Sequence, residues 1–276
     1  MPPLRLWPTL SRPPWGGLRL GAELGKGEGI IGESWEVWRE NRVVGVEARF
    51  SDLVDFPLLV KLLDTRQMLS VQVHPGDVDA RLRAGAPHGK AEAWVVLDAD
   101  PGARIAYGLN RTLTEAELRD HAASGQIEGD LAWIEPRPGD VIDVPPGTIH
   151  AIGPGLLLYE VQEPIDLTWR LYDWGRGREL HLDHACAVAR RDPLPSPFRA
   201  PKHIAPGVDR LIETRNFVVD RVRLPARRYG WEALTVVEGE AVVDGERCTK
   251  GGTFVLQPGE TQVQGAGVVL AARPGG

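Results

Sequence analysis

The sequence predicts a mainly β fold with a few short helices. Glycine and proline are frequent, at 32 and 23 of 276 residues, and they interrupt the chain at short intervals. Between these breaks lie short apolar runs, many of them alternating with polar residues at the period of a β-strand. Closely spaced strands joined by glycine and proline turns favour an all-β barrel or sandwich.

The expected strands follow one another along most of the chain. In order they are SVQVH (70–74), AEAWVVL (91–97), ARIAYGL (103–109), DVIDVPPG (140–147), LLLYEVQE (156–163), LTWRLYDW (167–174), NFVVDRVRL (216–224), ALTVVEGEAVV (233–243) and GTFVLQPG (252–259).

The clearest helix is TEAELRDHAAS (114–124). Thr114 and Glu117 have the spacing of a capping box, and Gly125 follows as a C-terminal stop signal. A second short helix is expected over Asp77–Ala84, and SDLVDFPLLVKLL (51–63) predicts a helix before a strand.

Domain organisation is indicated by the segment DPLPSPFRAPKHIAP (192–206), which contains five prolines. Such a segment reads as a Pro-rich linker. It predicts a larger N-terminal domain, residues 1–191, and a smaller C-terminal β domain, residues 207–276.

Composition and charge exclude several classes of protein. Apolar residues at 42% and charged residues at 25% are ordinary for a soluble globular protein. The formal charge of −6 provides no basic footprint and argues against a nucleic-acid partner. No apolar run is long enough to span a bilayer, and the proline-rich start lacks the apolar core of a signal peptide. We therefore expect a cytoplasmic protein with no membrane partner. Cys186 and Cys248 follow no metal or redox spacing, and each is expected to be a small buried apolar residue.

Two potential metal ligands lie on one face of the strand SVQVH. Alternate side chains of a strand share a face, so Val71 and Val73 point one way, and Gln72 and His74 point the other. Gln72 and His74 each offer a lone pair. Taken alone, this pattern equally fits a half-buried strand whose polar face meets water.

The stretch GDVIDVPPGTIHAIG (139–153) makes the metal site more specific. The spacing of Gly139, Pro145, Gly147 and His150 resembles the second motif of the cupin β-barrels, in which the histidine points into the barrel. The usual trailing asparagine of that motif is absent, because Pro154 takes its place.

In the first cupin motif, Gln72 and His74 would stand for the usual His-x-His, and Glu92 would be the acidic ligand. His150 alone could be a core histidine and Glu92 alone a solvated strand residue. Together, two imidazoles, a carboxylate and an amide oxygen form an N/O site for a divalent cation. Zinc is the first choice, although iron or manganese uses similar ligands.

Several further blocks resemble the type I mannose-6-phosphate isomerases in their shorter bacterial form. They cover roughly residues 15–190 and occur in the family order: GESWE (32–36), LLVKLLDTRQMLSVQVHPGDVDA (58–80), GKAEAW (89–94) and GDVIDVPPGTIHAIGPGLLLYEVQEPIDLTWRLYDWGR (139–176). The resemblance implies a jelly-roll cupin β-barrel, in which residues 1–191 form the metal-binding catalytic domain.

The resemblance also implies the activity and its ligands. These enzymes interconvert mannose 6-phosphate and fructose 6-phosphate, which requires moving a proton between C1 and C2 through a cis-enediol. By position, one Zn²⁺ per chain would be bound by Gln72, His74, Glu92 and His150. Arg170 falls where the family has its catalytic arginine, and it would hold the substrate and stabilise the enediolate.

Other pocket residues are expected on weaker grounds. Strand alternation allows Glu160 to face the metal side, Lys90 stands two residues before Glu92, and Lys61 is the one charge in an otherwise apolar run. Lys61, Lys90 and Arg170 are candidates for binding the sugar phosphate. The general base is left open among Glu160, Lys90 and a metal-bound water. Alternatively, Lys61 could be a snorkelling surface lysine and Glu160 a solvent-facing residue.

One departure from the family lies beside Arg170. The usual Ser-Asp-Thr-Thr-Tyr-Arg appears as Ile165-Asp166-Leu167-Thr168-Trp169-Arg170. Trp169 should face opposite Arg170, so altered packing is expected more than altered chemistry, although a shifted substrate preference stays open.

The C-terminal part weakly repeats the cupin pattern, with Gly252 followed after five residues by Pro258. No histidine occurs after His203, so this part is expected to be a second, metal-free cupin-like unit. An alternative function for the whole chain is a non-catalytic sugar-phosphate-binding sensor. A cupin oxygenase is disfavoured because it would use a more histidine-rich shell. The sequence does not indicate an oligomeric state.

Overall fold

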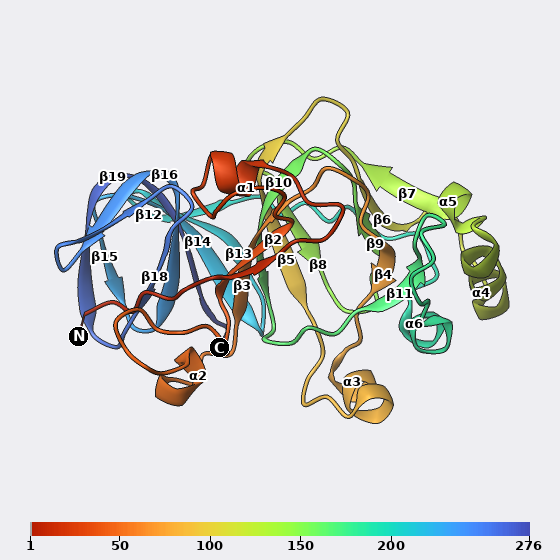
Figure 1. Cartoon of the computed structure of the whole chain (residues 1–276). Helices are drawn as coiled ribbons and strands as arrows, with labels where there is room; N and C mark the ends of the chain where they lie inside the picture. The colour runs from red at the N-terminus through yellow and green to blue at the C-terminus, as the bar shows by residue number, and fades with distance from the viewer. Residues whose placement is uncertain (1) are drawn as a thin grey trace. The chain divides into compact units, whose positions relative to one another are not determined.

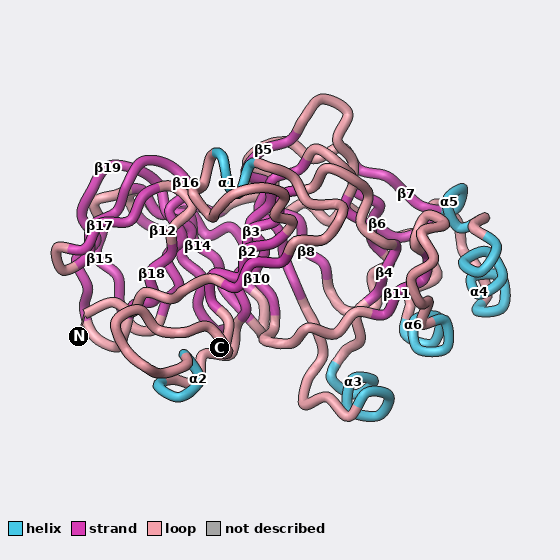
Figure 2. The backbone as a smooth tube through the Cα atoms, in the orientation of Figure 1, coloured by secondary structure: helices cyan, strands magenta, loops and turns pink. Residues whose placement is uncertain are grey.

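The computed structural model describes residues 2–276 and is mainly β, as the sequence predicts (Figure 1). Strands make up far more of the backbone than helices, and the helices are short segments (Figure 2). The chain divides into two compact units that alternate along the sequence. Unit 1 comprises Met1–Asp64, Leu158–Pro164 and Arg199–Gly276, and unit 2 comprises Thr65–Leu157 and Ile165–Phe198.

Unit 1 contains two groups of strands. The first group has the hydrogen-bonded order β1-β2-β3-β10, with β1 at Thr9–Ser11, β2 at Glu33–Val37, β3 at Leu59–Asp64 and β10 at Leu156–Gln162. The helices α1 (Arg19–Ala22) and α2 (Phe50–Leu53) lie between these strands in sequence. The second group is a C-terminal sheet of order β12-β13-β14-β19-β16-β17, to which β15 and β18 also pair. Its bounds are β12 Lys202–Ala205, β13 Val208–Glu213, β14 Phe217–Arg223, β15 Ala226–Tyr229, β16 Glu232–Val243, β17 Glu246–Thr249, β18 Thr253–Leu256 and β19 Glu260–Pro274.

Unit 2 is built around an antiparallel sheet of order β11-β4-β9-β6-β7, and it also contains β5 and β8, which pair with each other at the end of the sheet order β1-β2-β3-β10-β5-β8. The bounds are β4 Val71–Val73, β5 Glu92–Ala99, β6 Ile105–Leu109, β7 Leu131–Ile134, β8 Val141–Val144, β9 His150–Ile152 and β11 Trp169–Tyr172. Its helices are α3 Asp77–Ala84, α4 Glu115–Ser124, α5 Ile127–Asp130 and α6 Leu182–Val188.

The helix predictions are confirmed. Thr114 caps α4 and forms the expected capping box with Glu117, and Gly125 ends the helix in the left-handed conformation. The Oγ1 of Thr114 accepts a hydrogen bond from the Glu117 amide, while the Glu117 carboxylate accepts from the Thr114 amide. The helix α3 spans the predicted residues, and α2 precedes β3.

The core of unit 2 lies on one face of the β4-containing sheet. Val71 and Val73 are fully buried there, and they belong to a cluster with Leu118 and Ile127. The opposite face therefore presents the residues that alternate with the two valines, as the sequence predicts. Cys186 is part of the same core and is free, and Cys248 is buried and free in unit 1.

The predicted division into residues 1–191, a linker at 192–206 and residues 207–276 stays a prediction about independent domains. In the structure β12 lies within the proline-rich segment, and the first 64 residues group with the C-terminal sheet. Among the residues described, no helix is both long and apolar enough to cross a bilayer.

Candidate metal centre

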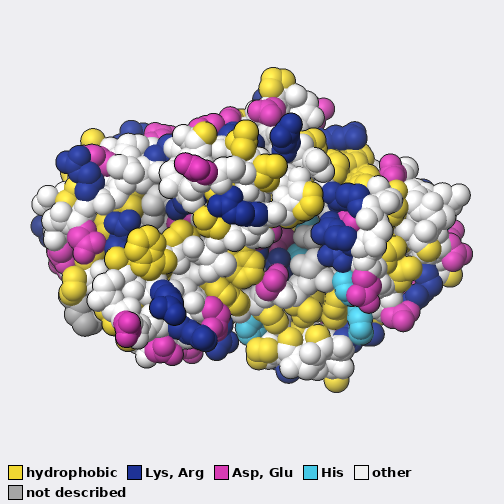
Figure 3. All heavy atoms as spheres, in the orientation of Figure 1, with side chains coloured by type: hydrophobic (Ala, Val, Ile, Leu, Met, Phe, Trp, Pro, Cys, Tyr) yellow, Lys and Arg dark blue, Asp and Glu magenta, His cyan; other side chains and the backbone are white. Residues whose placement is uncertain are grey.

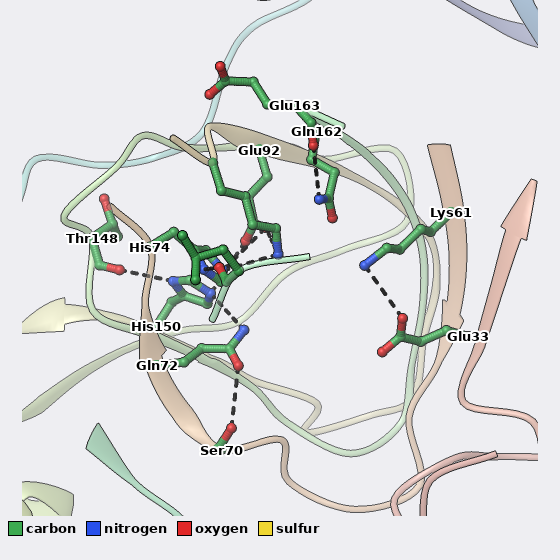
Figure 4. Close-up of polar contacts among 12 residues, drawn as sticks. Glu33, Lys61, Ser70, Gln72, His74, Glu92, Thr148, His150, Gln162 and Glu163 are labelled. Carbon is green, nitrogen blue, oxygen red and sulfur yellow. Dashed lines mark hydrogen bonds and ion pairs between the residues drawn. The ribbon is translucent and has the colours of Figure 1, made fainter. Parts of the chain in front are cut away.

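Three buried side chains of unit 2 converge in a small volume (Figure 4). His74 directly follows β4, Glu92 begins β5 and His150 begins β9. One donor atom from each lies within 4.8 Å of the other two. The turn before β9 helps to hold this arrangement, because the amide of Gly147 donates a hydrogen bond to the His74 carbonyl at 2.9 Å.

Backbone carbonyls orient both imidazoles. The Nδ1 of His74 lies 2.9 Å from the Leu167 carbonyl, and the Nδ1 of His150 lies 2.9 Å from the Thr148 carbonyl. A carbonyl oxygen only accepts, so each Nδ1 carries the hydrogen and each Nε2 keeps its lone pair. The carboxylate oxygens of Glu92 lie 3.5 Å from the Nε2 of His74 and 3.3 Å from the Nε2 of His150.

Burial keeps the imidazoles neutral, whereas the neighbouring Lys90 and imidazoles keep the carboxylate charged. Burial first, and Lys90 second, lower the pKa of His74 to about 3. Burial likewise lowers the pKa of His150. For Glu92, burial favours a higher pKa, but the nearby Lys90 and the two imidazoles together hold its pKa well below the ordinary value. Neutral imidazoles and an ionised carboxylate are the protonation states that metal ligands require.

Lys90 is the counter-ion of Glu92. Its Nζ lies 2.9 Å from the Oε2 of Glu92 and 3.3 Å from the Nε2 of His74, and the side chain is 5% exposed. Among residues 2–276, the Oε2 of Glu92 accepts no hydrogen bond of good geometry. A buried carboxylate oxygen held only by an ion pair, beside two imidazole lone pairs, fits a site for a divalent cation.

Gln72 belongs to a row of side chains that crosses the sheet. Directly paired residues place Arg170 of β11 beside Gln72 of β4, Gln72 beside His150 of β9, and His150 beside Tyr107 of β6. Cross-strand partners point to the same face, so these four side chains share the face of the metal cluster. The Gln72 amide nitrogen lies 3.1 Å from the Nε2 of His150, and its Oε1 accepts from Ser70 at 3.3 Å. A metal would require the amide to turn so that Oε1 faces His150, and Gln72 as a ligand stays a prediction.

Arg170 is partly buried, and its guanidinium is fixed by the chain that follows it. Its Nη1 donates to the Glu179 carbonyl at 2.7 Å, and its Nε is buried without a partner among the residues described. Burial and the nearby Arg178 lower the pKa of Arg170. Trp169 is 3% exposed and lies in the opposite, core face, as the strand pattern predicts.

Lys61 and Glu160 belong to unit 1, on β3 and β10. Both are buried, which excludes the alternatives of a snorkelling lysine and a solvent-facing glutamate. The Nζ of Lys61 lies 3.5 Å from Glu33 (Figure 4). It also lies 4.6 Å from the ring centroid of Trp35. Their roles at the substrate stay predictions.

Sequence reasoning did not find three contributors to the cluster. The Leu167 carbonyl comes from the segment that departs from the family pattern, and only tertiary pairing reveals its contact with His74. Trp94 packs edge-on against His150, with ring centroids 5.4 Å apart. Strand alternation placed Trp94 on the face of Glu92, which is a signal that could have identified it. Tyr107 enters the row only through the β6–β9 register.

The fold and the cluster define a mainly β protein with a buried His–Glu–His centre in its second unit. No family model matches the chain. A mannose-6-phosphate isomerase of Streptococcus mutans is 35% identical over 217 residues, which cover 67% of this chain and 67% of that protein. The chain belongs to the mannose-6-phosphate isomerase family.

Other comparisons agree with this assignment. The mannose-6-phosphate isomerase ManA of Bacillus subtilis is 42% identical over 146 residues, 51% of this chain and 46% of that protein, so the match spans about half of its length. The crystal structure of a mannose 6-phosphate isomerase from Bacillus subtilis covers 99% of this chain and 100% of its own, with a TM-score of 0.87 at 26% identity. These results confirm the predicted resemblance and the mainly β, cupin-type fold.

Proposed function

We propose that this chain interconverts mannose 6-phosphate and fructose 6-phosphate. The observation that carries the proposal is the buried cluster of His74, Glu92 and His150 with Lys90 in contact, found in a chain of the isomerase family. A sugar phosphate is then the small-molecule partner. The cytoplasmic location predicted from the sequence remains part of the proposal.

The proposed cofactor is one Zn²⁺. His74, Glu92 and His150 would hold it, with the Gln72 carbonyl as a fourth ligand, because zinc favours four N and O donors of this kind. When bound, zinc polarises a substrate oxygen as a Lewis acid. The carbonyls of Leu167 and Thr148 fix the ring orientation of both histidines, so the three donors are arranged before a metal arrives.

The remaining residues would act on the sugar. Isomerisation removes a proton from C2 of mannose 6-phosphate and returns one to C1, while O1 gains and O2 loses a proton. Negative charge develops on these oxygens in the enediol stage. Arg170 shares the face of Gln72 and His150 and keeps a permanent charge, which suits it to stabilise this charge and to hold the substrate.

Lys90 and Glu160 are the proposed proton carriers, and Lys61 and Lys90 the proposed phosphate partners beside Arg170. Lys90 is the best supported of them, since its ammonium already contacts Glu92 and His74. Glu160 and Lys61 are supported by burial alone. Separate Glu160→Gln and Lys61→Met variants, assayed for kcat and for KM, would assign the two roles.

The test is a coupled assay for fructose 6-phosphate formed from mannose 6-phosphate. Chelator-treated protein should be inactive, and added zinc should restore turnover. If the protein binds zinc but shows no turnover with zinc or with any other divalent metal, the isomerase proposal is refuted and the non-catalytic sugar-phosphate sensor is favoured. No zinc binding at all would remove the metal centre from the proposal.

A further inference from the structure

The segment Asp173–Glu179, which follows β11, closes on itself around one carboxylate. Asp173 is 3% exposed, and both of its oxygens accept hydrogen bonds from arginines. Arg176 donates from Nη2 to Oδ1 at 2.6 Å, and Arg178 donates from Nε to Oδ2 at 2.8 Å. Burial favours a higher pKa for Asp173, but these two guanidinium groups hold its pKa below the ordinary value. Asp173 is therefore charged and binds both arginines.

One arm of this cluster reaches the residues that lead into β4, the strand that contains Gln72 and precedes His74. Arg176 donates from Nη1 to the Met68 carbonyl at 2.8 Å, and the Trp174 indole donates to the Leu69 carbonyl at 2.6 Å. Trp174 adopts a φ of +54°, which few residues other than glycine tolerate. Met68 and Leu69 lead directly into Ser70 and β4. The ladder between β4 and β11 ends at Val71, so these side-chain bonds extend the attachment of β4 beyond the ladder.

The other arm returns to Arg170. The Nη1 of Arg170 donates to the carbonyl of Glu179, the residue next to Arg178. His181 pairs with the backbone of Arg170 in both directions: its amide donates to the Arg170 carbonyl, and its Nδ1 accepts from the Arg170 amide. Because Asp173 ties down Arg178, it fixes the carbonyl that orients the Arg170 guanidinium. On the face drawn in Figure 3, Lys and Arg side chains lie close to His side chains.

We propose that Asp173 is a positioning residue whose two arms are separable. Through Arg176 it fixes the position of β4, and therefore of Gln72 and His74. Through Arg178 it fixes the orientation of the Arg170 guanidinium. The first arm concerns metal binding only, and the second rests on the proposed function.

The experiment compares Arg176→Met, Arg178→Met and Asp173→Asn. Zinc affinity is measured by calorimetric titration of Zn²⁺ into metal-free protein, and kcat and KM are measured on zinc-saturated protein with mannose 6-phosphate. Arg176→Met should weaken zinc binding by roughly tenfold, the lower end of what outer-shell substitutions cost. Arg178→Met should leave zinc affinity within about twofold and lower kcat by roughly tenfold, because a misplaced guanidinium loses its hold on developing charge. Asp173→Asn should show both losses.

The matched control is Arg221→Met in unit 1. Arg221 donates to Asp209 at 2.8 Å and its side chain is 43% exposed, against 42% for Arg178. It should change neither zinc affinity nor kcat. Equal losses of both quantities in the two arginine variants, or losses no larger than in the control, would overturn the proposal. If Asp173→Asn does not fold, the comparison of Arg176→Met with Arg178→Met still tests the proposal. If the unaltered protein lacks isomerase activity, the proposed function and the second arm fail, and the zinc titrations still decide the first arm.

Discussion

Lys90 and Glu92 allow a prediction that separates the metal-free protein from the zinc-loaded one. Their charged atoms lie 2.9 Å apart, and both side chains are buried. At an effective dielectric constant of about 20, unit charges this close attract by roughly 6 kcal/mol. Breaking such a buried pair from one side costs about 3–5 kcal/mol. Lys90→Met should therefore destabilise the metal-free protein by about that amount, because it leaves Glu92 buried and unpaired.

Zinc should reverse much of this loss. A bound divalent cation would neutralise Glu92 in the variant, and in the unaltered protein it would sit near the ammonium of Lys90 and be repelled. The stabilisation that zinc provides should thus grow by roughly 3 kcal/mol in Lys90→Met, which corresponds to about hundredfold tighter binding. Turnover should fall, if Lys90 carries a proton or holds the substrate.

The assay is urea unfolding with and without zinc, together with a direct zinc titration. Lys26→Met is the matched control, because the Lys26 side chain is only 8% exposed and its Nζ lies 2.7 Å from Glu36 in unit 1. The control should lose similar stability in both states. An equal loss of stability in both states for Lys90→Met would show that Lys90 does not compensate for the missing metal, and the reasoning would be wrong.

Three further results are expected. His150→Ala should abolish zinc uptake, measured as bound metal after gel filtration, and undiminished uptake would remove His150 from the site. In the folded metal-free protein His74 stays neutral, because its pKa is lowered to about 3, whereas in the unfolded chain the same imidazole binds a proton below its ordinary pKa of 6.5. The free energy of unfolding should therefore fall by about 1.4 kcal/mol per pH unit from about pH 6.5 down to 4.5. Urea unfolding of His74→Asn should show a weaker dependence of stability on pH. Thr114→Ala should cost about 1 kcal/mol through the lost cap of α4, measured as a lower Tm, whereas Thr112→Ala nearby should cost less.

Local patterns predicted most of the secondary structure, because the elements around the site are consistent with their own sequence. The alternation of Val71 and Val73 with Gln72 and His74 set the two faces of β4 correctly. The glycine and proline turn before His150 brought that histidine to the start of β9. In such places the period of the side chains and the turn chemistry agree with the tertiary fold.

The contacts that complete the site depend on residues far apart in the chain. The Leu167 carbonyl is 93 residues from His74, and no local pattern indicates that pairing. Asp173 lies in a stretch that reads locally as the end of a strand, and its importance emerges only from its two arginines. The grouping of β1–β3 with the C-terminal sheet is likewise a matter of long-range packing.

The alternation of the two units along the chain has a consequence for biosynthesis. Unit 2 ends at Phe198, whereas unit 1 needs Arg199–Gly276 to be complete. The ribosome therefore finishes unit 2, including all three members of the His–Glu–His cluster, while much of unit 1 is still to be made. The His–Glu–His cluster is therefore synthesised in full before the C-terminal sheet of unit 1, β12–β19, has been made. A truncated messenger ending near residue 198 would yield a polypeptide with a potential zinc site and an unfinished first unit.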